Sequence, residues 1–250
     1  MRLATKYQIE TVRKRVVEIL HDSWPRTYEQ WRRFESEISV VREIHGDRLD
    51  HLVDGKSFDE RIPEPAAAIR FARDFDVPSI LPFAFYTLAG ISQSNDWDVA
   101  RKADSRKRSL AAAVMERTAR WSHLDIVDYR TFVKCREALT MDIFSIIEKF
   151  GRLEKVLANT LGEYCVGHAE SACHARVGVV FDAWHSHGPL EEEDKINAAK
   201  LPDPLGLLED LGNTSSTWQA CWGCRDGMRE YIKDTQIAVW RSIDMLKQCV

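Results

Sequence analysis

The feature that most constrains the fold is the helical spacing of the apolar residues, which the twelve glycines and eight prolines interrupt at only a few points. Over most of the chain, apolar side chains recur every three or four positions, which is the period of one face of an α-helix. No run of alternating β-branched residues is long enough for a sheet. The sequence therefore predicts an all-α fold, an irregular bundle of about seven to nine helices without a substantial sheet.

The expected helices are separated by prolines, glycines and charged stretches. They cover residues 3–23, 28–38, 66–75, 79–91, 96–120, 125–150 and 221–246. The stretch LPDPLGLLEDLGNTSS, which begins at Leu201, is rich in turn-forming residues and is predicted to be non-helical.

These patterns divide the chain into four regions: helices over residues 1–37, a mobile loop over 38–62, a helical core over 63–152, and a C-terminal helical region over 153–250 that carries cysteines and histidines. Within the loop, Gly55-Lys56-Ser57 is similar to the end of a phosphate-binding loop. Such a loop requires a glycine five positions earlier, where this chain has Asp50. We therefore interpret residues 55–57 as an ordinary loop.

The most apolar stretch, residues 77–91, is too short to cross a membrane and contains Pro82, so we assign it to the core. The predicted core residues are Phe71, Phe75, Ile80, Leu81, Phe83 and Phe85. The helix expected over 125–150 should pack along one apolar stripe, made of Ile126, Tyr129, Phe132, Val133, Leu139, Ile143, Ile146 and Ile147.

Composition excludes several classes of protein. Hydrophobic residues make up 44% of the chain, which argues against disorder, and 35 Lys and Arg against 39 Asp and Glu give a net charge of −4. A slightly acidic chain without a basic block does not favour nucleic acid or an anionic membrane as a partner. Because Lys6, Arg13, Lys14 and Arg15 interrupt any apolar centre of a signal peptide, we expect an intracellular protein, cytoplasmic or nuclear.

The C-terminal region carries the residues most typical of a metal site. Cys221 and Cys224 are spaced by two residues, as are Cys165 and His168, and Cys173 follows closely. Two such pairs can supply the four ligands of one structural zinc ion. The alternative is that these cysteines are buried, reduced thiols, which are common in protein cores. A thioredoxin-like redox role is disfavoured, because no hydrophobic strand precedes the Cys221 pair.

No other motif indicates catalysis. The chain has neither a GxSxG nucleophile elbow nor an HExxH metal motif. His185 and His187 precede Gly188-Pro189 and fit the end of a helix, where histidine interacts favourably with the helix dipole. Glu163 and Glu170 would serve as acid or base only if the zinc site were catalytic. We therefore expect a protein that is not an enzyme.

Several segments together resemble one family, the divergent BTB/POZ-domain proteins of mushroom-forming fungi, in the helical region that follows the BTB fold. The segments are RLATKYQIETVRKRVVEILHDSWP at Arg2, IPEPAAAIRFARDFDVPSILPFAFYTLAGI at Ile62, CREALTMDI at Cys135, LPDPLGLLEDL at Leu201 and CWGCRDGMREYIKDTQIAVWRSIDML at Cys221. Together they span most of the chain. In this resemblance, most of the BTB domain itself would lie before Met1.

The resemblance implies a helical protein-binding region, adaptor-like and linked to ubiquitin ligases or to transcription, that binds other proteins or a second copy of itself. In the same resemblance, the absent BTB half would leave an exposed apolar patch that includes Leu3, Val12 and Val16 and favours self-association or aggregation. The alternative function is a helical protein with one structural zinc ion bound by Cys165, His168, Cys173, Cys221 and Cys224, not all of which would be ligands at once.

Overall fold

The computed structural model describes residues 10–47, 52–102, 117–151, 203–213 and 221–245. Eight α-helices and three short 3₁₀ helices lie within these ranges, and the only β-structure there is two isolated bridges. The predicted all-α class is confirmed. None of the helices in these ranges is both long and apolar enough to span a membrane.

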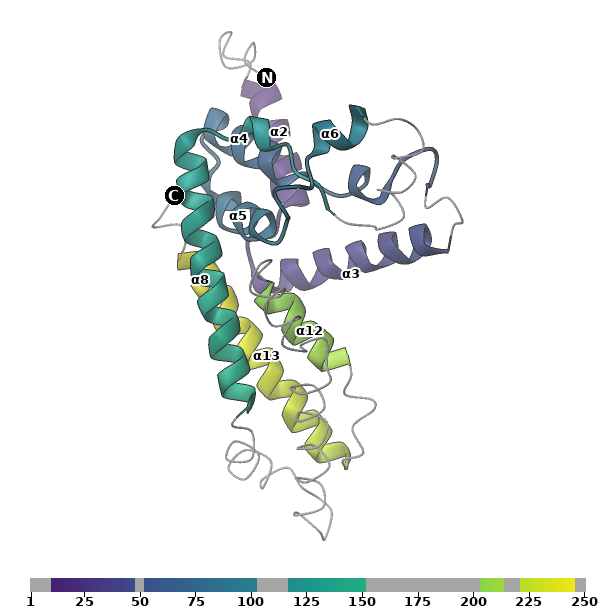
Figure 1. Ribbon diagram of the computed structural model, residues 1–250, viewed down its shortest axis with the longest axis vertical. Helices are drawn as coiled ribbons and strands as arrows, with labels where there is room; N and C mark the ends of the chain where they lie inside the picture. The colour runs from purple at the N-terminus through teal and green to yellow at the C-terminus, as the bar shows by residue number, and fades with distance from the viewer. Residues whose placement is uncertain (1–9, 48–51, 103–116, 152–202, 214–220, 246–250) are drawn as a thin grey trace. The chain divides into compact units, whose positions relative to one another are not determined.

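The chain divides into two compact units, one of residues 1–135 with 243–250 and the other of residues 136–242. In the first unit lie α2 (Glu10–Ser23), α3 (Tyr28–Gly46), η1 (Phe58–Glu60), α4 (Pro65–Phe75), η2 (Pro78–Ile80), α5 (Leu81–Ala89), α6 (Trp97–Lys102) and η3 (Trp121–His123). The long helix α8 (Ile126–Gly151) begins in the first unit and continues unbroken into the second (Figure 1). The second unit also contains α12 (Pro204–Asn213) and most of α13 (Trp222–Met245), as far as Ser242.

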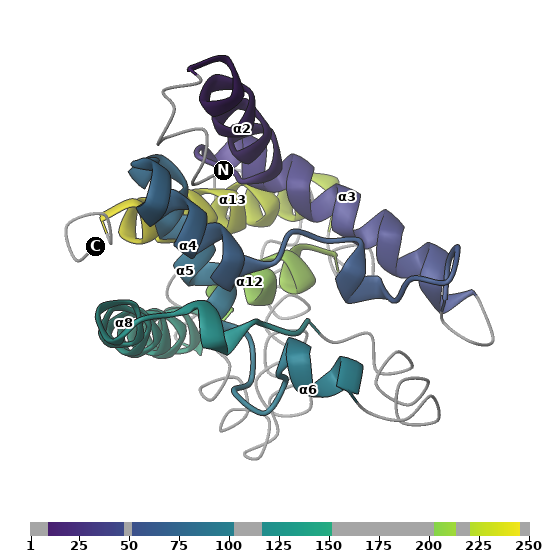
Figure 2. The same ribbon diagram turned by 90° about the horizontal axis from the view of Figure 1, so that it is seen from above.

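The core of the first unit is built around α5, in which all nine residues are buried. A helix that is apolar around its whole circumference has to be enclosed, and α4 packs directly against it (Figures 1 and 2). Phe83 of α5 contacts Trp24 and Phe34, with ring centroids 6.2 and 5.5 Å apart. These aromatic contacts hold the start of α3 against α5.

In the second unit, α12 and α13 are joined by a hydrogen bond of 3.0 Å from the Gln236 amide to the Glu209 carboxylate. The Ser242 hydroxyl of α13 donates to Asp142 of α8 at 2.8 Å. The buried apolar residues of this unit include Leu139, Ile143, Leu205, Leu208, Leu211, Met228 and Ile232. The second unit therefore has its own core.

Five of the six predicted core residues, Phe75, Ile80, Leu81, Phe83 and Phe85, are buried. The assignment of Phe71 is wrong, because its side chain is 41% exposed. Phe71 stacks on Phe75 one turn later, with ring centroids 6.1 Å apart. It therefore lies at the margin of the apolar face of α4.

Helix α3 extends to Gly46, so the first nine residues of the predicted loop 38–62 are helical. Ile38 and His45 are buried seven residues apart, on one face of α3, and the His45 ring packs edge-on against Phe58 at 6.2 Å. The charged residues Arg42 and Glu43 that suggested a loop are exposed. Tertiary contact on one face thus keeps a highly charged segment helical.

Two further segment predictions are wrong. The stretch LPDPLGLLEDLGN contains α12, because Pro204 occupies the first helical turn, where proline is tolerated, and the Asp203 carboxylate accepts the Gly206 N–H at 2.9 Å. The helix expected over 96–120 includes α6, but residues 117–120 are not helical. Ala119 instead forms an isolated bridge with Asp96.

Candidate interaction surface

Helix α8 begins at a side-chain cap. The Asp125 carboxylate accepts hydrogen bonds from the backbone N–H groups of Val127, at 2.8 Å, and Asp128, at 2.9 Å. The bond from Asp128 has the largest effect on Asp125 and, with the bond from Val127, lowers the pKa of its carboxyl below the ordinary 3.8. An aspartate at this position satisfies N–H groups that have no partner within the helix.

One face of α8, the inner face, is buried. Its members are Asp128, Thr131, Phe132, Cys135, Leu139, Ile143 and Ile146. The Asp128 carboxylate, only 1% exposed, pairs with Arg73 of α4 at 3.2 Å, and Phe132 packs edge-on against Trp121 at 5.4 Å. These contacts fix the rotation of the first part of α8 about its own axis.

The opposite face of α8, here called the outer face, is apolar as well. Its large side chains are exposed: Ile126 by 66%, Val127 by 54%, Val133 by 49%, Met141 by 67% and Phe144 by 50%. At about 100° per residue, these five positions fall within roughly a third of the circumference. Among the described helices α8 carries the most exposed large apolar residues, since α2 and α3 have two each.

The outer face corrects the sequence-based assignment of α8. Ile126 and Val133 were expected in a single core stripe with Phe132 and Leu139, yet both are exposed. A helical wheel separates the two groups, because Ile126, Val133 and Phe144 are spaced by seven and eleven residues, close to two and three turns. The signal for a second apolar face was therefore present in the sequence.

Three charged residues lie among the apolar residues of the outer face. Arg130, Lys134 and Glu137 are all exposed. They occupy the middle of the face, with Ile126 and Val127 on one side along the helix and Met141 and Phe144 on the other. The outer face thus has two apolar ends and a charged centre that carries both signs.

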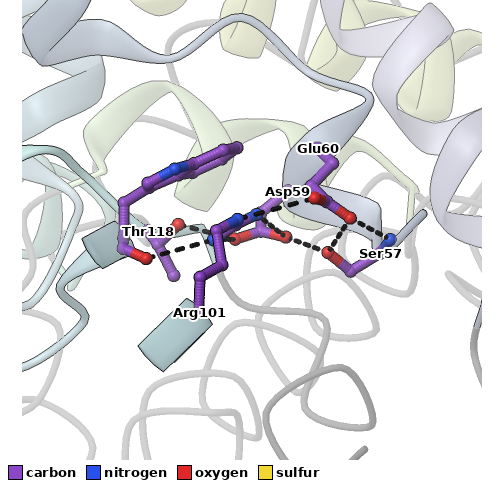
Figure 3. A network of polar contacts seen from close by, with 6 residues as sticks. Ser57, Asp59, Glu60, Arg101 and Thr118 are labelled. Atoms are coloured by element: carbon purple, nitrogen blue, oxygen red, sulfur yellow. Dashed lines mark hydrogen bonds and ion pairs between the residues drawn. The ribbon is translucent and has the colours of Figure 1, made fainter. Parts of the chain in front are cut away.

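A cluster of polar side chains surrounds Asp59, and Figure 3 shows how they converge. The Asp59 carboxylate accepts from the Ser57 hydroxyl at 2.5 Å and the Thr118 hydroxyl at 2.6 Å. Two guanidinium nitrogens of Arg101 lie 3.2 and 3.3 Å from it. A carboxylate offers about four lone-pair sites, so these contacts leave it little capacity to act as a base or a metal ligand.

Arg101 links this cluster to two further groups. Its guanidinium lies over the Trp97 ring, 3.1 Å from the centroid, and 3.5 Å from the Glu60 carboxylate. Burial disfavours ionisation of Glu60, but the hydrogen bonds from Ser57 and the charge of Arg101 outweigh it and lower the pKa of Glu60. The cluster therefore joins η1, α6 and residue 118, which makes it a structural clamp. Nothing in the sequence pattern had indicated it.

Of the predicted zinc ligands, Cys165, His168 and Cys173 lie outside the described residues, as do His185, His187, Glu163 and Glu170. Cys221 is half-buried immediately before α13 and Cys224 is fully buried in its first turn. The Cys224 N–H donates to Cys221 Sγ at 3.5 Å. Within the described ranges, no three His, Cys, Asp or Glu residues are grouped closely enough to hold a metal ion.

The residues predicted to drive self-association are only partly exposed. Val12 is 42% exposed, Val16 is half-buried, and Leu3 lies outside the described residues. Val12 and Ile19, at 50%, form a smaller apolar pair on α2. This pair is less extensive than the outer face of α8.

A comparison of the chain with models of protein families, with curated proteins and with solved structures gave no match in any of the three. The resemblance to BTB/POZ proteins therefore stays a prediction from the sequence.

Proposed function

We propose that this protein is a non-enzymatic protein-interaction module that binds its partner through the outer face of α8. The observation that carries the proposal is that α8 is apolar on two opposite faces, of which only the inner face is buried. A surface helix that contacts only its own core normally presents polar residues on the opposite side. Exposed apolar residues gathered on one face are typical of a surface that binds another protein.

The hydrogen bonds of the polar cluster around Asp59 support the proposal that the protein binds a partner and is not an enzyme. The acceptor sites of Asp59 are occupied by neighbouring side chains, which suits a clamp between segments and leaves little room for proton transfer. An adaptor role linked to ubiquitin ligases or transcription is the finer part of this proposal, and its support is the sequence resemblance alone.

The experiment that tests the proposal uses a photo-crosslinking amino acid placed at Phe144. In cells that express the full chain, we expect irradiation to link this position to defined peptides of one partner, identified by mass spectrometry. The matched control places the same amino acid at Lys233, an exposed position of α13. The crosslink at Phe144 should be lost when Val133→Lys adds a charge to the same face.

Equal, diffuse crosslinking from the Phe144 and Lys233 positions would contradict the proposal. So would a defined partner that still crosslinks at full yield with Val133→Lys, because a partner seated on the outer face has to contact this side chain. The circular dichroism spectrum of each variant shows whether the fold is retained.

Zinc binding is the second candidate function. The observation that favours it is the backbone hydrogen bond to Cys221 Sγ, since such a bond stabilises a thiolate, the form that binds metal. Cys221 and Cys224 supply two of the four ligands that a structural zinc requires. Cys165, His168 and Cys173 remain the candidates for the others.

Elemental mass spectrometry of protein purified without a metal-affinity tag tests this second candidate. One zinc ion per chain that is absent from the Cys221→Ser variant would support zinc binding. A chain purified without zinc, whose melting temperature is the same with and without Cys221→Ser, would contradict it. The control is Cys135→Ser, because Cys135 is a cysteine of α8 that is not among the predicted zinc ligands.

A further inference from the structure

The charges at the centre of the outer face follow a pattern that limits what can bind there. Lys134 and Glu137 lie on adjacent turns and have opposite signs, and the apolar ends of the face flank them on both sides. A surface with this arrangement is complementary to itself when it is reversed end to end.

In an antiparallel pair of α8 helices centred between residues 135 and 136, Lys134 lies opposite Glu137 of the second copy. By the two-fold symmetry, Glu137 then lies opposite Lys134 of that copy. The same register sets Val127 against Phe144 and Val133 against the small residue Ala138. Lys134 and Glu137 thus each meet the opposite charge, and Val127 meets an apolar group. In the same register Arg130 lies opposite Met141 and Ile126 lies opposite Ser145, so the complementarity rests on Lys134, Glu137, Val127 and Phe144.

A parallel pairing gives the reverse result. In register, it would oppose Arg130, Lys134 and Glu137 each to its own copy, and like charges that face each other across a helix pair are destabilising. The charge pattern therefore discriminates between the two orientations.

We infer that the occupant of the outer face is α8 of a second copy of this chain, packed antiparallel about a two-fold axis. This inference rests on the proposed function, because it names the partner of the same surface. The face from Ile126 to Ser145 is about 30 Å long at 1.5 Å per residue. One helix pair of this length lies at the small end of specific interfaces, so the dimer is weak and reversible.

The test is sedimentation equilibrium of the full chain over a roughly hundredfold range of concentration, which carries a weak dimer across its dissociation constant. We expect Lys134→Glu alone and Glu137→Lys alone each to raise that constant by about tenfold or more, because each variant faces two like-charge pairs. The matched control is Lys233→Glu, the same change at an exposed position of α13, which should leave the constant unchanged.

Two rescue measurements make the register itself testable. An equimolar mixture of the two single variants should form a mixed dimer, because Lys134→Glu in one chain then faces Glu137→Lys in the other. The double variant Lys134→Glu/Glu137→Lys should dimerise with a constant within about threefold of the unchanged chain. If a single variant failed to dimerise because it was misfolded, neither the mixture nor the double variant would restore the dimer.

A chain that stays monomeric at every concentration overturns the inference, and so does a dimer that is indifferent to both single variants or is not restored in the mixture. A monomer that nevertheless crosslinks a different protein from Phe144 overturns only the identity of the partner and leaves the proposed function standing. A monomer without a specific crosslink at Phe144 overturns both.

Discussion

Helices α5 and α8 are both apolar on opposite faces, but the structure uses them differently. All nine residues of α5 are buried, whereas the five large apolar residues on the outer face of α8 are about half exposed or more. The two helices differ in what surrounds them and also in composition, since α5 has no charged residue and α8 has eight among its 26. Apolar residues on opposite faces of a helix therefore do not by themselves mark the centre of a fold, because the second apolar face can lie exposed, as it does in α8.

The largest effect is expected in α5. Phe83→Ala should lower the free energy of unfolding by about 3 to 5 kcal/mol, because Phe83 is 2% exposed and contacts the rings of Trp24, Phe34 and Tyr86. Chemical denaturation monitored by tryptophan fluorescence measures the change. If Phe83→Ala lowered the free energy of unfolding by less than about 1 kcal/mol, α5 would be no more important for stability than the exposed face of α8.

The inner face of α8 should respond next. Arg73→Ala leaves the Asp128 carboxylate, 1% exposed, without its cation at 3.2 Å. Removing one partner of a buried pair costs about 3 to 5 kcal/mol, and the partial exposure of Arg73 places this case lower, at about 2 to 3 kcal/mol. In the variant Arg73→Ala/Asp128→Asn the uncompensated charge is gone, so its denaturation midpoint should recover part of the loss.

The cap of α8 should give a smaller and pH-dependent effect. Asp125→Ala should cost about 1 kcal/mol at neutral pH, because two backbone N–H groups lose their acceptor. Since folding lowers the pKa of Asp125 below 3.8, its ionised form contributes stability above the pKa of the unfolded chain, and the contribution is lost as the pH falls through the folded pKa. Thermal melts of both proteins should therefore converge in acid. A difference that grows in acid would contradict this.

The outer face of α8 should contribute least to folding. Phe144→Ser removes a side chain that is 50% exposed and should change the free energy of unfolding of the monomer by about 0.5 kcal/mol or less. The measurement is a denaturation curve at low protein concentration, where self-association does not contribute. A large loss would mean that this face is part of the core, and the contrast with α5 would disappear.

The sequence was most informative where a local pattern is sufficient. The periods of α4, α5, α8 and α13 predicted these helices, and the apolar run at residues 77–91 identified the core around Phe83. Predictions were wrong where composition outweighed spacing. The charges of residues 39–46 concealed the end of α3, and the prolines and glycines of residues 202–213 concealed α12, although Leu205, Leu208 and Leu211 have helical spacing.

For the candidate surface, the spacing of Ile126, Val133 and Phe144 alone could have separated two faces of α8. Which face is buried could not be derived in this way, because both are apolar. The contacts of Asp128 with Arg73 and of Phe132 with Trp121 make that choice, and they join residues eleven to fifty-five positions apart.

By itself, the sequence determined the helical class, most helix boundaries and the apolar centre of the first unit, because these follow from periodicity and capping within a few turns of chain. Only the tertiary structure decided which apolar residues are enclosed, that Asp59 is held by Ser57, Thr118 and Arg101, and that the outer face of α8 is exposed. The physical reason is that burial and ion pairing depend on which segments meet in space, and a local pattern states only what each segment could present.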